Sequence, residues 1–167
     1  FQGNESFHLP SVFVDSTGCF PFRSPFQGNL FFRRNGVIIL DIQCIDCHII
    51  MCEGNDPYND LWVDKGKFTA CSGDDFAFRG FSLDMTYFEH NGKHYVIWAE
   101  IKGDSSLFMA QINPDEPWKL TSKPILLTKP EYNWEKVNNK VNEGAAVLKT
   151  NSKIYVFFSA SSGAMRL

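Results

Sequence analysis

Short apolar runs separated by turn-forming residues fill the chain from residue 28 onward, a pattern typical of β-strands joined by turns. The strongest turn signal is Asn35-Gly36, which lies between two apolar runs. Asn and Gly both tolerate the positive φ that a tight hairpin turn requires. The strands expected around this turn span residues 30–33, 37–42, 47–52 and 61–68, the last interrupted by Gly66.

This arrangement recurs along the chain, with turns at Asn35, Asn91 and Asn151 that are 56 and then 60 residues apart. The second and third turns agree closely, because residues 91–96 read Asn-Gly-Lys-His-Tyr-Val and residues 151–156 read Asn-Ser-Lys-Ile-Tyr-Val. Four short antiparallel strands repeated at a fixed period are typical of propeller blades. The sequence therefore predicts an all-β fold, a fragment of about two and a half blades of a β-propeller. The further strands are expected at residues 85–88, 95–98, 107–112, 125–127, 145–148 and 154–158.

The repeat also divides the chain. An irregular leader over residues 1–27 does not fit the repeat, and a partial propeller domain follows over residues 28–167. Its blades are expected near residues 28–70, 82–128 and 143–167. A helix across residues 134–148 is the alternative for one segment, because five apolar residues there recur at helical spacing. Three Asn residues and a Gly in the same segment disfavour a helix.

Composition narrows the classes of function. The chain has 167 residues, a net charge of −3 and a pI of about 5.8, which argues against nucleic acid as a partner because phosphate contacts need clustered Lys and Arg. Its longest aliphatic run is Val37–Leu40, far short of the roughly 20 apolar residues of a membrane span, so no membrane partner is expected. The 16 Phe suit a fold in which sheets pack face to face. The chain opens at Phe1 without Met or a visible signal peptide, so we expect part of a longer protein.

Two acids occupy similar places in the repeat. Asp84 lies seven residues before its Asn-Gly turn and Glu143 lies eight residues before the next turn, each expected just ahead of the first strand of a blade. First strands line the channel of a propeller, so these carboxyl groups would face one another at its mouth. Paired carboxyl groups beside aromatic residues suit glycoside hydrolysis. The alternative from spacing alone is two unrelated surface acids.

The motifs around these acids carry a family resemblance. Residues 82–88 with the turn that follows resemble the third blade of glycoside hydrolase family 43, and residues 141–148 resemble its fourth. The resemblance extends from about His48 to Ser162 and implies a five-bladed propeller that hydrolyses α-L-arabinofuranosides, β-xylosides or arabinans with inversion. It implies that Glu143 is the general acid and that Asp84 raises the pKa of that acid and orients it.

The resemblance also implies what the chain lacks. The general base of the family is an Asp two blades before the Asp84 blade, which places it upstream of Phe1, and Asp15 does not match its motif. We therefore expect residues 1–167 alone to be nearly inactive. Ala145 replaces the Pro that usually follows Glu-Gly in the family.

The family allows a structural calcium ion, for which no ligand is identified, and no other cofactor is expected. The expected partner is a carbohydrate such as arabinoxylan, arabinan or a xylo-oligosaccharide, and the parent protein is expected to be secreted. A noncatalytic propeller that binds sugar or protein is the alternative.

A second motif, Cys44-Ile-Asp-Cys47-His48, has the spacing of a c-type haem attachment signal or part of a zinc site. It lies within an alternating, strand-like pattern over residues 42–51, where neither site is favoured. His90 and His94 flank a hairpin turn, so they are expected on the surface rather than as a ligand pair.

Aromatic and basic residues near the acids complete the set. Trp134 lies nine residues before Glu143, where it could stack on a sugar ring or pack in the core. Trp98 and Trp118 are expected to pack within blades. Arg79 precedes the Asp84 strand and is expected in a solvated loop, with pairing to a carboxylate as the alternative.

Overall fold

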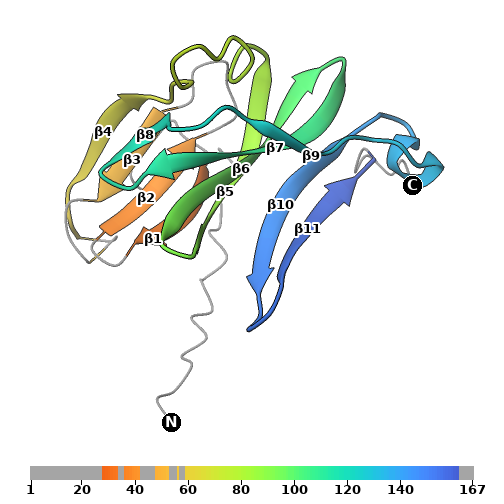
Figure 1. Cartoon of the computed structure of the whole chain (residues 1–167). Coiled ribbons are helices and arrows are strands. Elements are labelled where there is room, and N and C mark those ends of the chain that lie inside the picture. Colours follow the sequence, from red (N-terminus) through yellow and green to blue (C-terminus); the bar gives the residue numbers. More distant parts are fainter. Residues whose placement is uncertain (1–27, 34–35, 42–47, 53–55, 57–58, 162–167) are drawn as a thin grey trace.

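The computed structural model describes residues 28–33, 36–41, 48–52, 56 and 59–161, with side chains placed from residue 56 onward except for Trp62. This part of the chain is almost entirely β-strand, arranged as three sheets side by side (Figure 1). The first sheet contains β1 (Gly28–Arg33), β2 (Gly36–Asp41), β3 (His48–Cys52) and β4 (Trp62–Lys67). The second contains β5 (Phe81–His90), β6 (Lys93–Lys102), β7 (Asp104–Asn113), β8 (Glu116–Leu120) and β9 (Ile125–Thr128). The third pairs β10 (Asn142–Lys149) with β11 (Ile154–Ala160).

The hairpin turns follow the sequence signals. His90 lies opposite Lys93, and the two turn residues between them, Asn91 and Gly92, have φ of 51° and 71°. Positive φ at both positions is what favours Asn-Gly in a two-residue hairpin. In the first sheet Gly36 pairs within β2, so it lies at the strand end rather than in the turn predicted there.

The outer edge of the second sheet is divided between two strands. β8 pairs with the end of β7 through Ile112 and Leu120, whereas β9 pairs with its middle through Leu107 and Thr128. The sequence predicted β9 but not β8. Three of the five residues of β8 are a Pro and two charged residues, so the strand has no alternating hydrophobic pattern from which it could be predicted.

The second sheet is buried on both faces. Alternate residues of β6 point to opposite sides, so Val96 and Trp98 join one hydrophobic cluster while Ile97 and Ala99 join another. All four side chains are fully buried. The first cluster packs against Phe68 and the segment after it, and the second packs against β10 and β11. An uninterrupted apolar run is therefore required in β6.

The first strands of the three sheets are neighbours, since β5 contacts both β1 and β10. This is the arrangement expected around the axis of a propeller. The helix considered across residues 134–148 is reduced to one 3₁₀ turn, η1 (Asn133–Lys136), and β10 begins at Asn142. Asp84 and Glu143 lie inside β5 and β10 rather than ahead of them. The leader over residues 1–27 lies outside the described residues.

Candidate functional site

The two predicted acids lie at β-bulges in adjacent inner strands. In β5 the residues left out of the pairing with β6 begin with Asp84, and in β10 those left out of the pairing with β11 begin with Gly144, directly after Glu143. Asp84 and Gly144 both adopt left-handed backbone conformations, with φ of 51° and 64°. Asp is one of the few side chains enriched in this region. Asp84 is thus the first residue of its bulge, whereas Glu143 is the last paired residue before its bulge. This difference of one position explains why Asp84 lies seven residues before its hairpin turn and Glu143 eight residues before the next.

A hydrogen bond connects the two bulges. The backbone N–H of Gly144 donates to the carboxylate of Asp84. A Cβ at position 144 would lie 3.5 Å from the Ser159 hydroxyl oxygen and 4.0 Å from Oδ2 of Asp84. Glycine suits this position mainly because of the positive φ, which residues with an L side chain rarely adopt. The residue after Glu143 therefore holds the Asp84 carboxylate beside the second acid.

The surroundings of the pair favour protonation of Glu143. Partial burial raises the pKa of the Glu143 carboxyl above its ordinary value, and the nearby charge of Asp84 raises it further. Burial also raises the pKa of Asp84, while the hydrogen bond from Gly144 acts in the opposite direction. A carboxyl group that keeps its proton at higher pH than a free side chain can donate that proton to a leaving oxygen.

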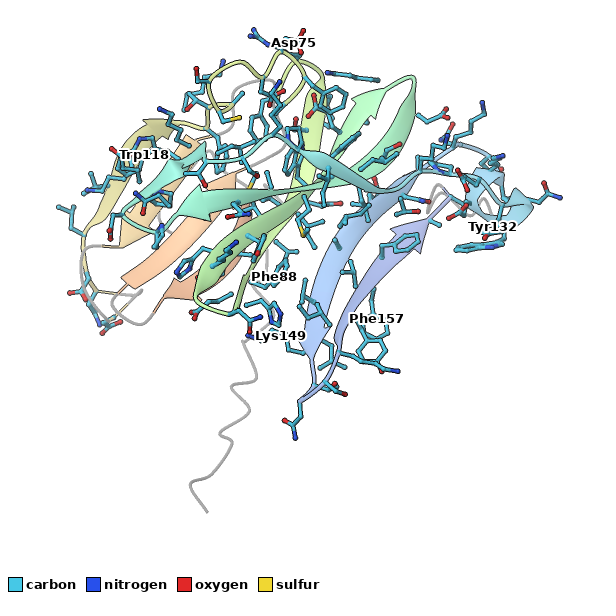
Figure 2. All side chains as sticks on the ribbon, in the orientation of Figure 1. Asp75, Phe88, Trp118, Tyr132, Lys149 and Phe157 are labelled. Carbon is cyan, nitrogen blue, oxygen red and sulfur yellow. The ribbon has the colours of Figure 1, made fainter. Side chains whose placement is uncertain are left out.

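An exposed aromatic pair lies on the loop before β10. Trp134 and Tyr132 are 58% and 65% exposed, and their rings are parallel within 8° at a centroid distance of 6.3 Å. Tyr132 lies at the opposite end of the molecule from Trp118 (Figure 2). Core packing, the alternative considered for Trp134, is wrong because the loop carries this side chain into solvent.

Two buried polar residues next to Glu143 were not identified from the sequence. Asn142 is fully buried at the start of β10, and Glu135 is 1% exposed within η1. Nothing in the sequence marks either as buried, since Asn and Glu are usually surface residues. They connect the aromatic loop to the strand that carries Glu143.

The remaining tryptophans and Arg79 have structural positions. Trp98 is fully buried and donates its indole N–H to Glu100 at 3.0 Å, while Trp118 is partly buried against the same cluster, as expected for packing residues. Arg79 is exposed, and its backbone N–H rather than its guanidinium binds Glu100, at 3.1 Å.

The histidines do not form a ligand pair in the described structure. The ring of His94 stacks on Tyr87 and its Nδ1 lies 2.5 Å from the Tyr87 hydroxyl, whereas His90 is exposed at the end of β5. Cys44 and Cys47 of the haem-like motif lie outside the described residues. Among the residues that are described, no group of three or more His, Cys, Asp or Glu could hold a metal ion. Within the same part of the chain, no helix has the length and apolarity needed to cross a membrane.

Comparisons with curated proteins identify arabinofuranosidases as relatives. The chain is 39% identical over 111 residues to an extracellular exo-α-(1→5)-L-arabinofuranosidase of Streptomyces chartreusis. This alignment covers 64% of this chain and 31% of the relative. It is 34% identical over 114 residues to α-L-arabinofuranosidase B of Pyricularia oryzae, across 65% of this chain and 22% of that protein. The chain thus spans less than a third of the length of these relatives.

Solved structures agree in fold. The α-L-arabinofuranosidase of Lactobacillus brevis superposes with a TM-score of 0.67 at 32% identity, covering 81% of this chain and 45% of that one. A thermostable family-43 glycoside hydrolase superposes with a TM-score of 0.61 at 21% identity, covering 82% and 46%. The described strands therefore form part of a five-bladed β-propeller, and the predicted all-β fold is confirmed. The model of the glycosyl hydrolases family 43 matches residues 41–165. The chain belongs to this family.

Proposed function

We propose that the protein containing this chain hydrolyses α-L-arabinofuranosidic bonds in arabinose-containing polysaccharides. The observation that carries this proposal is the pairing of Asp84 and Glu143 through Gly144 in adjacent inner strands of a family 43 fold. The names of the curated relatives favour an arabinofuranoside over a β-xyloside as substrate. One of these relatives is named as extracellular, which supports secretion and a substrate from plant cell walls.

In the proposed mechanism Glu143 is the general acid. Its carboxyl group holds a proton because burial and the charge of Asp84 raise its pKa. The proton passes to the glycosidic oxygen as the bond between that oxygen and the anomeric carbon breaks. Asp84 remains beside Glu143 and orients it, while the N–H of Gly144 fixes the Asp84 carboxylate.

The second half of the mechanism requires a general base. A carboxylate on the opposite face of the sugar removes a proton from water, whose oxygen then attacks the anomeric carbon and inverts its configuration. We expect this base to be an Asp outside the described residues. The mechanism uses only carboxyl groups and water, so it needs no cofactor.

Trp134 is proposed to contact the carbohydrate. It lies in the loop that leads to the Glu143 strand, and its ring is exposed beside that of Tyr132. Exposed aromatic rings offer an apolar face on which the C–H groups of a sugar can stack. Part of an arabinan or arabinoxylan chain would lie there, beyond the sugar that is cleaved.

The test is hydrolysis by the complete polypeptide in which these 167 residues occur. Wild-type protein and Glu143→Gln are assayed with an arabino-oligosaccharide and with a matched xylo-oligosaccharide. We expect the wild type to release arabinose with inversion, observed by proton NMR of the first product. We expect Glu143→Gln to lose about 10²- to 10⁴-fold in kcat/KM, the range that general acid catalysis contributes.

Glu116→Gln is the matched control, because Glu116 is an exposed acid on β8, and it should leave the rate unchanged. A folded Glu143→Gln protein as active as the wild type would overturn the proposed role of Glu143. Sugar binding without turnover by the wild type would instead support the noncatalytic propeller.

A further inference from the structure

A buried carboxylate organises the loop before β10. Glu135 accepts hydrogen bonds at Oε2 from the backbone N–H groups of Glu131 and Tyr132, at 2.6 and 2.7 Å, and at Oε1 from the side-chain amide of Asn142, at 3.1 Å. These contacts, the bond from Tyr132 first among them, lower the pKa of Glu135 despite its burial. Glu135 therefore remains charged, and both of its oxygens have partners.

Asn142 connects this carboxylate to the strands around it. Its Nδ2 also donates to the Thr128 hydroxyl at the end of β9, at 3.2 Å, and its backbone carbonyl accepts from the Ser105 hydroxyl in β7, at 3.3 Å. A carboxylate can only accept hydrogen bonds, so Glu135 determines which end of the Asn142 amide faces it. Asn142 is thus bound to η1, β7 and β9 at once, one residue before Glu143.

The bulge in β10 makes this anchoring important for Glu143. Glu143 pairs with Ser159, but the next two residues are left out of the regular pairing with β11. On the C-terminal side of Glu143, the backbone pairing with β11 is therefore interrupted until Ala146. On its N-terminal side the backbone is held by Asn142 and, through Asn142, by Glu135.

We propose that Glu135 and Asn142 are a positioning pair that fixes the backbone from which Glu143 projects toward the leaving oxygen. The inference rests on the proposed role of Glu143 as general acid. The pair also ties Glu143 to the aromatic loop, because Glu135 binds the backbone N–H of Tyr132. The proton donor and the aromatic surface formed by Tyr132 and Trp134 are then parts of one hydrogen-bonded unit.

Exchanging the two functional groups tests this pair. Asn142→Asp places a second carboxylate against Glu135 and removes the amide donor, so the contact becomes repulsive. In the double variant Glu135→Gln with Asn142→Asp, the Gln oxygen can accept from the two backbone N–H groups while its amide donates to the new carboxylate. The contact is then restored with its polarity reversed. The variants are compared at neutral pH, because a proton shared between two carboxyl groups would mask the repulsion in acid.

The readout is the dependence of the rate on the leaving group. An arabino-oligosaccharide has a poor leaving group that needs protonation, whereas 4-nitrophenyl α-L-arabinofuranoside has a good one that needs it less. A displaced acid should affect the first substrate more, and a misplacement of about 1 Å can cost about 10²-fold. We expect Asn142→Asp to lose about 10- to 100-fold in kcat on the oligosaccharide and less than about 3-fold on the nitrophenyl substrate. The double variant should recover most of this difference.

A purely structural role would give another result. Loss of folded protein lowers both rates equally, so equal losses on the two substrates, or no recovery in the double variant, would overturn the positioning role. Glu116→Gln is the control, because Glu116 is an exposed acid on β8 that takes no part in this network, and it should leave the ratio unchanged. Folding is checked by circular dichroism, and Asn142→Ser, which lacks the amide, replaces Asn142→Asp should that variant not fold.

The two proposals fail in different ways. If the wild type is active, Glu143→Gln is inactive and Asn142→Asp loses equally on both substrates, the positioning role is refuted while the general acid role of Glu143 stands. Full activity of Glu143→Gln removes the general acid and the positioning pair together.

Discussion

At the scale of single residues, the charge of the Asp84 carboxylate raises the pKa of Glu143. Asp84→Asn removes that charge but keeps an oxygen that can accept the Gly144 N–H, so the pKa of Glu143 should fall. General acid catalysis requires the protonated form, and its loss sets the alkaline limb of the pH profile. We therefore expect this limb of kcat/KM to move to lower pH in Asp84→Asn, with about 10- to 100-fold lower activity at neutral pH. Profiles of the two proteins measured in parallel test this, and an unmoved alkaline limb would contradict it.

The residue scale is also where the sequence was least informative. The roles proposed for Asp84 and Glu143 came from motifs that resemble a family, because their spacing alone left surface acids as an alternative. Asn142 and Glu135 carried no signal, since the burial of a polar side chain depends on contacts with β7, β9 and η1. Trp134 shows the reverse case, in which a large aromatic residue is exposed because its loop turns outward.

At the scale of elements, a second buried carboxylate joins β6 to the segment that leads into β5. Glu100 is 1% exposed and accepts the backbone N–H groups of Phe78, Arg79 and Gly80 and the indole N–H of Trp98, at 3.0 to 3.1 Å. The Lys102 ammonium lies 3.5 Å from the same carboxylate. The Asp84 strand is therefore held at its beginning by one side chain of its neighbour.

Replacing this carboxylate should destabilise the sheet. Each oxygen of Glu100 accepts two N–H groups, so Glu100→Gln would place an amide NH₂ against donors and leave at least one buried N–H without a partner. We expect the free energy of unfolding to fall by about 2–4 kcal/mol, given about 1.5–3 kcal/mol for a hydrogen bond to a charged group. Urea denaturation of the 167-residue chain measures this, with Glu116→Gln on β8 as the exposed control. A change below about 0.5 kcal/mol, the size typical of surface substitutions, would contradict the prediction.

Strands were predictable where local chemistry alone determines them. The Asn91-Gly92 turn and the apolar run of β6 depend on φ preferences and on burial of both faces, and both can be read from the sequence. β8 was missed because a short outer strand with Pro117 lacks a clear apolar pattern. The start of β10 was placed too late, because Asn142, Glu143 and Gly144 look like a loop until the neighbouring elements that bury Asn142 are known.

At the scale of the whole molecule, the described residues supply one half of the proposed reaction. Glu143 is the proposed proton donor and Asp84 its proposed neighbour, and the base that would activate water is expected elsewhere. Residues 1–167 also cover only 45% of the Lactobacillus brevis arabinofuranosidase chain. The proposed chemistry therefore separates into protonation of the leaving oxygen, which we propose for Glu143, and activation of water, for which we expect a base outside the described residues.

This separation can be measured on residues 1–167 alone. With 4-nitrophenyl α-L-arabinofuranoside we expect turnover about 10²- to 10⁴-fold below that of the Lactobacillus brevis enzyme assayed in parallel, the range attributed to one missing acid–base group. Azide is a nucleophile that needs no deprotonation, so it should raise the rate by replacing both water and the base. The product should then be the β-configured arabinofuranosyl azide, because attack still comes from the face opposite the leaving group. Near-normal turnover in water would show that a base lies within these residues, and a rate unaffected by azide would show that the missing base is not what limits the chain.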